Sequence, residues 1–221
     1  MANEKSRILI FGGTGYIGKY MIKASIALGH PTFIYSCPLN AEISLSKLQL
    51  CQEFTSMGTN FIHGELEYDQ IVAAIKKVDI VISTLTYPQV LDQLKIIDAI
   101  KVAGNIKRFL PSEFGSKGDT IKPLPPFQAF LDKKISIGRA TEEAGIPYTY
   151  VPANCYAAYF VYLCRRRAPR SAVSSINRIP LKKRIAMKMT NLIDRISMAI
   201  ITATVGAVRR IMMKLAQVVS V

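Results

Sequence analysis

The chain contains the stretch Gly12-Gly13-Thr14-Gly15-Tyr16-Ile17-Gly18, and this stretch decides its fold. It follows an apolar run over 7–11 that is typical of a β-strand, and it precedes a segment over 19–28 whose apolar residues recur at helical spacing. Between a strand and a helix, this glycine pattern predicts a dinucleotide-binding turn. Gly12 permits a tight turn, Gly15 lets the backbone approach a pyrophosphate, and Gly18 lets the helix pack closely on the strand. A turn that merely requires glycine is the alternative.

The segments that follow repeat this order of strand and helix. Strands are expected over 7–11, 32–36, 60–63, 79–84, 108–111 and 147–151. Helices are expected over 19–28, 71–77, 89–103 and 127–144. The segment 79–84 is almost wholly apolar, as in strands that are buried on both faces of a parallel sheet. The alternation therefore predicts an α/β fold with a Rossmann-type, doubly wound parallel sheet and right-handed crossovers.

Basic charge is concentrated at one end of the chain. The 221 residues carry a formal net charge of +14, but residues 1–160 hold 16 Lys and Arg against 14 Asp and Glu. Residues 161–221 hold 13 Lys and Arg against one acid, Asp194, and the strand–helix alternation stops there. We therefore expect an NAD(P)-binding Rossmann domain over 1–160 and a basic tail over 161–221. The net charge describes the tail and does not indicate a nucleic-acid-binding protein.

Cysteine and histidine positions argue against a metal site. The four cysteines are scattered without a CxxC spacing, and His30 and His63 lie far apart. Free thiols of a cytoplasmic protein are the simpler interpretation. Residues 1–7 lead into the first strand without an apolar segment, so we expect no signal peptide. The longest uncharged apolar stretch of the tail, 196–208, has 13 residues, whereas a membrane-spanning helix needs about 20. We expect a cytoplasmic protein without a transmembrane segment.

The residues after the second strand bear on the choice between NAD and NADP. An acid there binds the ribose 2′-hydroxyl of NAD, whereas an arginine accepts the 2′-phosphate of NADP. Residues 35–38 read Tyr-Ser-Cys-Pro and supply neither, and the missing acid favours NADP. Lys47 is a candidate cation, with a solvated lysine as the alternative. No tyrosine is followed by lysine four residues later, so the Tyr-x-x-x-Lys pair of short-chain dehydrogenases is absent.

Three segments, 12–18, 102–115 (VAGNIKRFLPSEFG) and 145–151 (GIPYTYV), together resemble one family. It is the plant isoflavone reductase-like family, an NmrA-like, atypical group of short-chain dehydrogenases that also includes phenylcoumaran benzylic ether reductases. Segments 28–31 (LGHP) and 153–160 (ANCYAAYF) are most similar to eugenol and isoeugenol synthases.

The resemblance implies NADPH-dependent reduction of a small phenylpropanoid. In the phenylpropene synthases a lysine takes the para-hydroxyl proton of a coniferyl ester, the carboxylate leaves, and hydride from the nicotinamide quenches the quinone methide. That lysine matches Lys134, just before the segment 139–143 (RATEE). A desolvated lysine can act as such a base. An exposed helix lysine is the alternative, and the neighbouring Lys133 looks alike in the local sequence.

The same resemblance implies the remaining site residues. The implied cofactor-binding residues are Gly12, Gly13, Thr14, Gly15, Tyr16, Ile17, Gly18, Cys37, Ser112, Glu113, Phe114, Lys134, Asn154 and Cys155. The implied substrate residues are Tyr156 and Tyr159, although a core tyrosine is an alternative for Tyr159. No metal is implied.

Two features depart from the family pattern. Where this chain has Cys37, the family has an arginine that binds the 2′-phosphate. The loss of that arginine would weaken NADPH binding by about 1.5–3 kcal/mol. The resemblance ends near Phe160, although family members continue well beyond that point. We therefore expect a sheet that is incomplete at its C-terminus, in a truncated isoform or gene model whose tail comes from an intron or a shifted frame.

Three alternatives stay open. Truncation would leave the chain inactive if the missing part supplies the substrate wall. A non-catalytic, NADP-binding, NmrA-like regulatory module is the second alternative. The basic tail is also suited to weak binding of an acidic surface such as a membrane, calmodulin or RNA.

Overall fold

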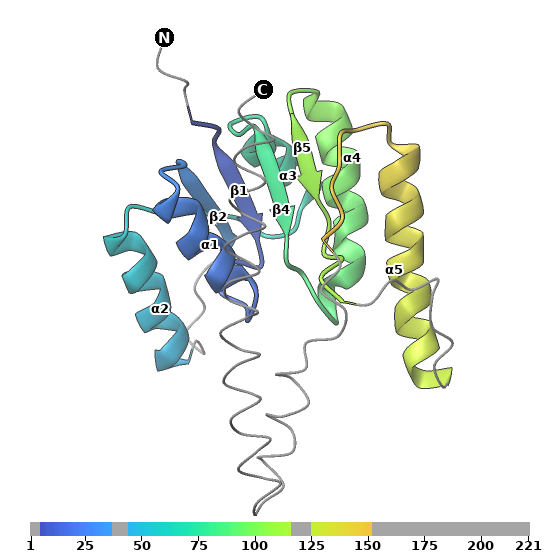
Figure 1. The fold of residues 1–221 in the computed structure, drawn as a ribbon, viewed down its shortest axis with the longest axis horizontal. Helices are drawn as coiled ribbons and strands as arrows, with labels where there is room; N and C mark the ends of the chain where they lie inside the picture. The colour runs from blue at the N-terminus through green and yellow to red at the C-terminus, as the bar shows by residue number, and fades with distance from the viewer. Residues whose placement is uncertain (1–4, 37–43, 116–124, 152–221) are drawn as a thin grey trace, which may run out of the picture.

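A parallel sheet forms the centre of the molecule in a computed structural model that describes residues 5–36, 44–115 and 125–151 (Figure 1). The sheet has five strands in the order β3-β2-β1-β4-β5. Their bounds are β1 (Ile8–Phe11), β2 (Thr32–Ser36), β3 (Asn60–His63), β4 (Ile80–Ser83) and β5 (Arg108–Leu110). Each neighbouring pair is parallel. Starting from β1, the chain adds β2 and β3 on one side and then β4 and β5 on the other side. This change of direction at β1 is typical of a doubly wound fold.

Helices cover both faces of the sheet (Figure 1). They are α1 (Gly18–Ala27), α2 (Leu45–Ser56), α3 (Tyr68–Ile75), the 3-10 helix η1 (Gln89–Asp92), α4 (Gln93–Ala103) and α5 (Pro125–Glu143). Helices α1 and α2 pack on one face through Met21, Ile22 and Phe54. Helices α3, α4 and α5 pack on the other face, where they contribute Ile71, Ile96 and Ile137 to the core. The predicted α/β, Rossmann-type sheet is therefore confirmed.

The central strands are apolar on both faces because each face carries a layer of helices. Along β1, Ile8 and Ile10 pack with α1, whereas Leu9 and Phe11 pack with α3 and α4. All four residues of β1 and of β4 are buried. This double burial explains why these segments lack the alternation of apolar and polar residues that half-exposed strands show.

The structure departs from the predicted elements in several places, among them the segment 89–103, which forms η1 followed by α4. Helix α2 was not expected, because only Cys51 and Phe54 of its twelve residues are buried and its apolar face is weak. The segment 147–151 is not a strand: Tyr148 forms a single parallel bridge with Phe109. The helix expected over 71–77 begins earlier, at Tyr68, and ends at Ile75.

Several predictions fall on residues outside those that the structure describes. They concern Cys37, the domain boundary at residue 160, and the tail over 161–221 with its binding to an acidic surface. These stay predictions. Within the described ranges, no helix is both long and apolar enough to cross a membrane.

Asp79 joins the starting ends of three strands. Its carboxylate accepts hydrogen bonds from the backbone N–H of Arg7 at 2.8 Å and from Arg7 Nε at 3.2 Å. Lys107 Nζ lies 3.5 Å from the other carboxylate oxygen. Burial by itself would raise the pKa of Asp79, but the hydrogen bonds from Arg7 and the charges of Lys107 and Arg7 lower it overall. Asp79 thus ties β1, β4 and β5 together at one edge of the sheet.

We expect Asp79→Asn to lower the free energy of unfolding by about 1–2 kcal/mol near neutral pH. Because the folded-state pKa is depressed, the contribution of Asp79 is complete above its unfolded pKa, about 3.9. It is lost as the pH falls further, through the folded-state pKa. Urea unfolding of both proteins from pH 6 to pH 2.5 measures this. A difference between the two proteins that does not shrink below about pH 4 would contradict the account.

Two buried serines give a matched test of hydrogen bonding in the core. Ser25 Oγ lies 2.7 Å from Thr32 Oγ1, and both side chains are buried. Ser83 Oγ is also buried but has no hydrogen-bond partner among the described residues. We expect Ser25→Ala to cost about 1–2 kcal/mol of stability and Ser83→Ala to be neutral or stabilising. Chemical denaturation of both variants tests the contrast, and equal losses would refute it.

Candidate cofactor and active site

The glycine-rich turn lies at the carboxyl end of β1, where ligands bind in open parallel sheets. Gly12 has a φ of 75°, a backbone conformation that residues with a side chain rarely adopt. The N–H of Gly15 donates to the carbonyl of Gly12 at 2.9 Å and closes the turn. Gly15 and Tyr16 are exposed, Thr14 and Ile17 are half-buried, and Gly13 is buried. The outer residues of the turn are therefore open to a ligand.

The inner glycines allow α1 to begin directly against the turn. A Cβ on Gly18 would lie 2.6 Å from Gly13 Cα, and a Cβ on Gly13 would lie 2.7 Å from Ile22 Cδ1. Helix α1 has neither a side-chain hydrogen bond at its N-cap nor an acid in its first turn. A helix N-terminus without these groups favours an anion such as a pyrophosphate.

Thr84 supports the turn and was not predicted from the sequence. Its hydroxyl donates to the carbonyl of Phe11 at 2.8 Å, and a Cβ on Gly12 would lie 2.8 Å from Thr84 Oγ1. The residue directly follows β4, which pairs with β1. Because this contact joins residues 73 positions apart, no local pattern identifies it.

A second turn, Ser112–Gly115, follows β5 and is fixed to the rest of the fold. The backbone N–H of Ser112 donates to Gln93 Oε1 at 2.8 Å, and Gln93 Nε2 donates to the carbonyl of Val90 at 3.1 Å. Gln93 and Phe114 are both buried. The family resemblance implied Ser112, Glu113 and Phe114 at the end of a strand but did not imply Gln93, which lies at the start of α4.

Lys134 reaches from α5 to this second turn. Its Nζ lies 3.8 Å from Glu113 Oε1, and the two side chains are only 11% and 17% exposed. Burial lowers the pKa of Lys134, while the charge of Glu113 partly opposes that change. Burial also raises the pKa of Glu113, opposed by the charge of Lys134. The amine of Lys134 therefore lies in a setting that favours loss of its proton.

Lys133 has a different environment, although the two lysines are adjacent. Its Nζ lies 5.9 Å from the ring centroid of Tyr87, and Tyr87 is 69% exposed. Lys134 is thus not an exposed helix lysine, and the structure separates two residues that the local sequence did not.

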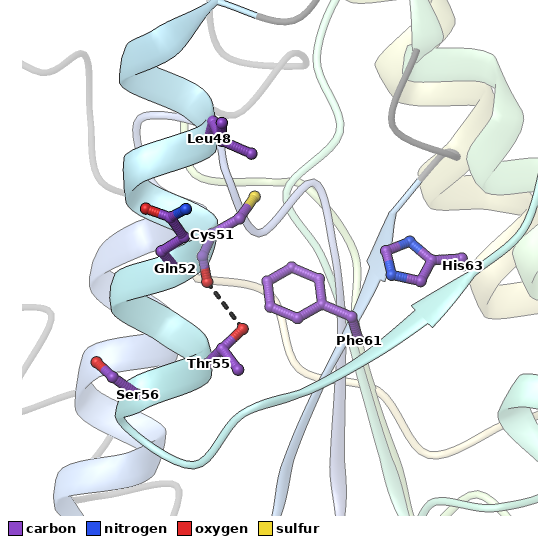
Figure 2. A pocket seen from close by; sticks show the side chains of 7 residues that line it. All are labelled: Leu48, Cys51, Gln52, Thr55, Ser56, Phe61 and His63. Carbon is purple, nitrogen blue, oxygen red and sulfur yellow. Dashed lines mark hydrogen bonds between the residues drawn. The ribbon is translucent and has the colours of Figure 1, made fainter. Parts of the chain in front are cut away.

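A hollow of about 420 Å³ lies elsewhere, between α2 and β3 at the edge of the sheet (Figure 2). It is lined mostly by apolar surface, and its residues are Leu48, Cys51, Gln52, Thr55, Ser56, Phe61 and His63. Burial raises the pKa of the Cys51 thiol, and the charge of Lys47 partly opposes this. None of the predicted site residues lines the hollow, so it is separate from the two turns.

The other predicted site residues, Cys37, Asn154, Cys155, Tyr156 and Tyr159, lie outside the described residues. In the part of the chain that the structure describes, no group of three or more His, Cys, Asp and Glu residues is placed to hold a metal ion.

We expect Gly18→Ala to destabilise the protein by about 1–3 kcal/mol, because the new Cβ meets backbone atoms that cannot move away. Gly138→Ala in α5 is the control. Its Cβ would lie 3.6 Å from the Tyr150 hydroxyl, an ordinary contact, and alanine favours a helix over glycine by about 0.5–1 kcal/mol. Thermal unfolding should lower the Tm of the first variant and raise that of the second. Equal Tm values for Gly18→Ala and the wild type would contradict the close packing.

Comparison with known proteins identifies the family. The NmrA-like family matches residues 4–172 of this chain. Isoeugenol synthase 1 of Petunia hybrida is 58% identical over 176 residues, which is 79% of this chain and 54% of that protein. Phenylcoumaran benzylic ether reductase IRL1 of Ginkgo biloba is 52% identical over 158 residues, or 71% of this chain and 51% of that protein.

Two solved structures are also similar to this chain. An isoflavone reductase has a TM-score of 0.67 at 37% identity, over 71% of this chain and 52% of that chain. A complex described as AtPrR2 with NADP+ and (+)pinoresinol has a TM-score of 0.66 at 38% identity over the same shares. The chain spans about half the length of the curated relatives that it matches. The resemblance to isoflavone reductase-like proteins is confirmed, and the chain belongs to the NmrA-like family.

Proposed function

We propose that this chain carries the cofactor-binding part of an NADPH-dependent reductase that acts on small phenylpropanoids, in the manner of the isoeugenol synthases. The partly buried pair of Lys134 and Glu113, at the same sheet edge as the glycine-rich turn, is the observation that carries this proposal. The strands β1, β4 and β5 are parallel, so the segments after their carboxyl ends gather at one edge.

The glycine-rich turn fits a dinucleotide. Gly12, Gly13 and Gly18 leave no room for a Cβ, which keeps the turn flat against β1 and α1. The pyrophosphate would lie on the exposed backbone of Gly15 and at the N-terminus of α1. NADPH would supply a hydride to the substrate when bound. The NADP+ in the related complex supports this choice of cofactor.

Selection of NADPH over NADH would rest on a positive charge near the ribose 2′-phosphate. At the position where the family has an arginine, this chain has Cys37, which supplies no positive charge. Lys47, in the first turn of α2, is the cation that we propose for this role. Its contribution would be that of an exposed charge, so we expect only a modest preference for NADPH.

Lys134 would act as the base that accepts the phenolic proton of the substrate. Only a neutral amine can accept a proton, and burial lowers the pKa of Lys134 and thereby raises the neutral fraction. The phenolate formed in this way expels the carboxylate from the side chain of a coniferyl ester. Tyr156 and Tyr159 stay proposed substrate contacts.

A non-catalytic, NADP-binding module is the second candidate, because the glycine-rich turn fits a dinucleotide whether or not a substrate is turned over. Cofactor binding without turnover distinguishes this candidate from the reductase. Both candidates require NADPH to bind, so binding is measured first, as a rise in Tm with NADPH and with NADH.

We expect Lys134→Met to lower the turnover of coniferyl acetate by about 100-fold or more, because a general base is removed. Lys133→Met is the matched control and should leave turnover nearly unchanged. The rise in Tm with NADPH should persist in Lys133→Met and become smaller in Lys134→Met, because Lys134 is also an expected cofactor contact. Equal turnover in the two lysine variants would overturn the role of Lys134. Binding of NADPH by a wild-type chain that never turns over the ester would favour the module.

A further inference from the structure

Glu113 is held more firmly than a surface glutamate. It lies between Ser112, whose backbone is tied to Gln93 at 2.8 Å, and Phe114, which is buried. Its own N–H donates to the carbonyl of Pro111 at 2.7 Å. Anchors on both sides fix the backbone from which the carboxylate extends. The backbone that carries this carboxylate therefore has a defined place beside β5.

Lys134 is fixed from the opposite side. It lies on α5 between Leu131 and Ile137, which are both buried in the core. Its Nζ lies 5.9 Å from the ring centroid of Phe130, and a Cβ on Gly115 would lie 3.8 Å from it. The amine is thus held above the second turn, where Glu113 is the charged group that acts on it.

The opposite charges of Lys134 and Glu113 face each other across a contact that is partly shielded from water. An ammonium at 3.8 Å from a carboxylate keeps its proton more firmly than a lone buried ammonium does. Glu113 faces one further titratable group: its charge, after burial and the charge of Glu142, also raises the pKa of Tyr150. Tyr150 lies with its hydroxyl 3.2 Å from Glu142 Oε1 and 3.1 Å from the carbonyl of Gly138.

We propose that Glu113 is a positioning residue for Lys134: its carboxylate, 3.8 Å from the amine, anchors that amine above the second turn. This differs from the cofactor-binding role that the sequence suggested for Glu113. Its catalytic consequence rests on the proposed function, but the anchoring itself does not. Burial and Glu113 act in opposite directions on the amine, and their balance decides how much neutral lysine is present.

The test follows the proton on Lys134 directly in the full 221-residue chain. Protein labelled with ¹³C at the lysine Cε is titrated by NMR, and the Lys134 signal is assigned by its loss in Lys134→Arg. We expect Glu113→Gln to lower the titration midpoint of Lys134 by about 1 pH unit, because a facing opposite charge is removed. The Lys133 signal should not move, since its neighbour is the ring of Tyr87.

Glu113→Asp keeps the charge and serves as the second variant if the glutamine variant does not fold. Its carboxylate is one methylene shorter, so we expect a midpoint between those of the wild type and Glu113→Gln. Unchanged Lys134 midpoints in the folded variants would overturn the proposal, as would equal shifts of Lys133 and Lys134.

A second readout connects the pair to turnover. In Glu113→Gln, the acidic limb of the kcat profile for coniferyl acetate should move to lower pH by the same amount, with KM little changed. A moved Lys134 midpoint in a chain without turnover supports the pair and refutes the reductase. Turnover with an unmoved midpoint supports the reductase and refutes the role of Glu113.

Discussion

The parallel register of β1, β4 and β5 is the constraint on which the site depends. Ile8 is paired with Ile80, and Ile80 with Arg108, so the three strands start level. Asp79 fixes that starting edge through Arg7 and Lys107. Because the strands are short and start level, they also end level, and the segments that follow them meet. The glycine-rich turn, Thr84 and the second turn lie at the same edge of the sheet for this reason.

Two kinds of contact position the residues that follow these strands. At β1 the requirement is steric, because glycines without a Cβ let α1 and Thr84 approach the turn. At β5 the requirement is polar, because buried Gln93 holds the backbone of Ser112 in place. Lys134 then reaches the second turn from α5 and meets Glu113. The glycine-rich turn and the ionisable pair are therefore held by different contacts.

The sequence predicted the parts of this arrangement that local patterns encode. The glycine spacing over 12–18 and the apolar segment 79–84 predicted the central strands and the turn. Helix α2 was missed because Leu45 and Leu48 are exposed, so its apolar residues do not share one buried face. Adjacent lysines on a helix point about 100° apart, yet only the position of the second turn shows which one meets Glu113.

Long-range contacts account for what local patterns did not reveal. Thr84 and Gln93 act on residues 73 and 19 positions away, and neither belongs to a recognisable motif. The family resemblance supplied Lys134 and Glu113 as positions, but their opposition across 3.8 Å appears only in three dimensions.

The most direct test of the central claim is an NMR map of backbone amide shifts on adding NADPH to the full chain. The claim is that the carboxyl edge of β1, β4 and β5 is the dinucleotide site. It predicts shifts concentrated at residues 12–18, at Thr84 and at the second turn, with little change around the hollow between α2 and β3 (Figure 2). Shifts centred on Cys51, Phe61 and His63, or none in a folded chain, would contradict it.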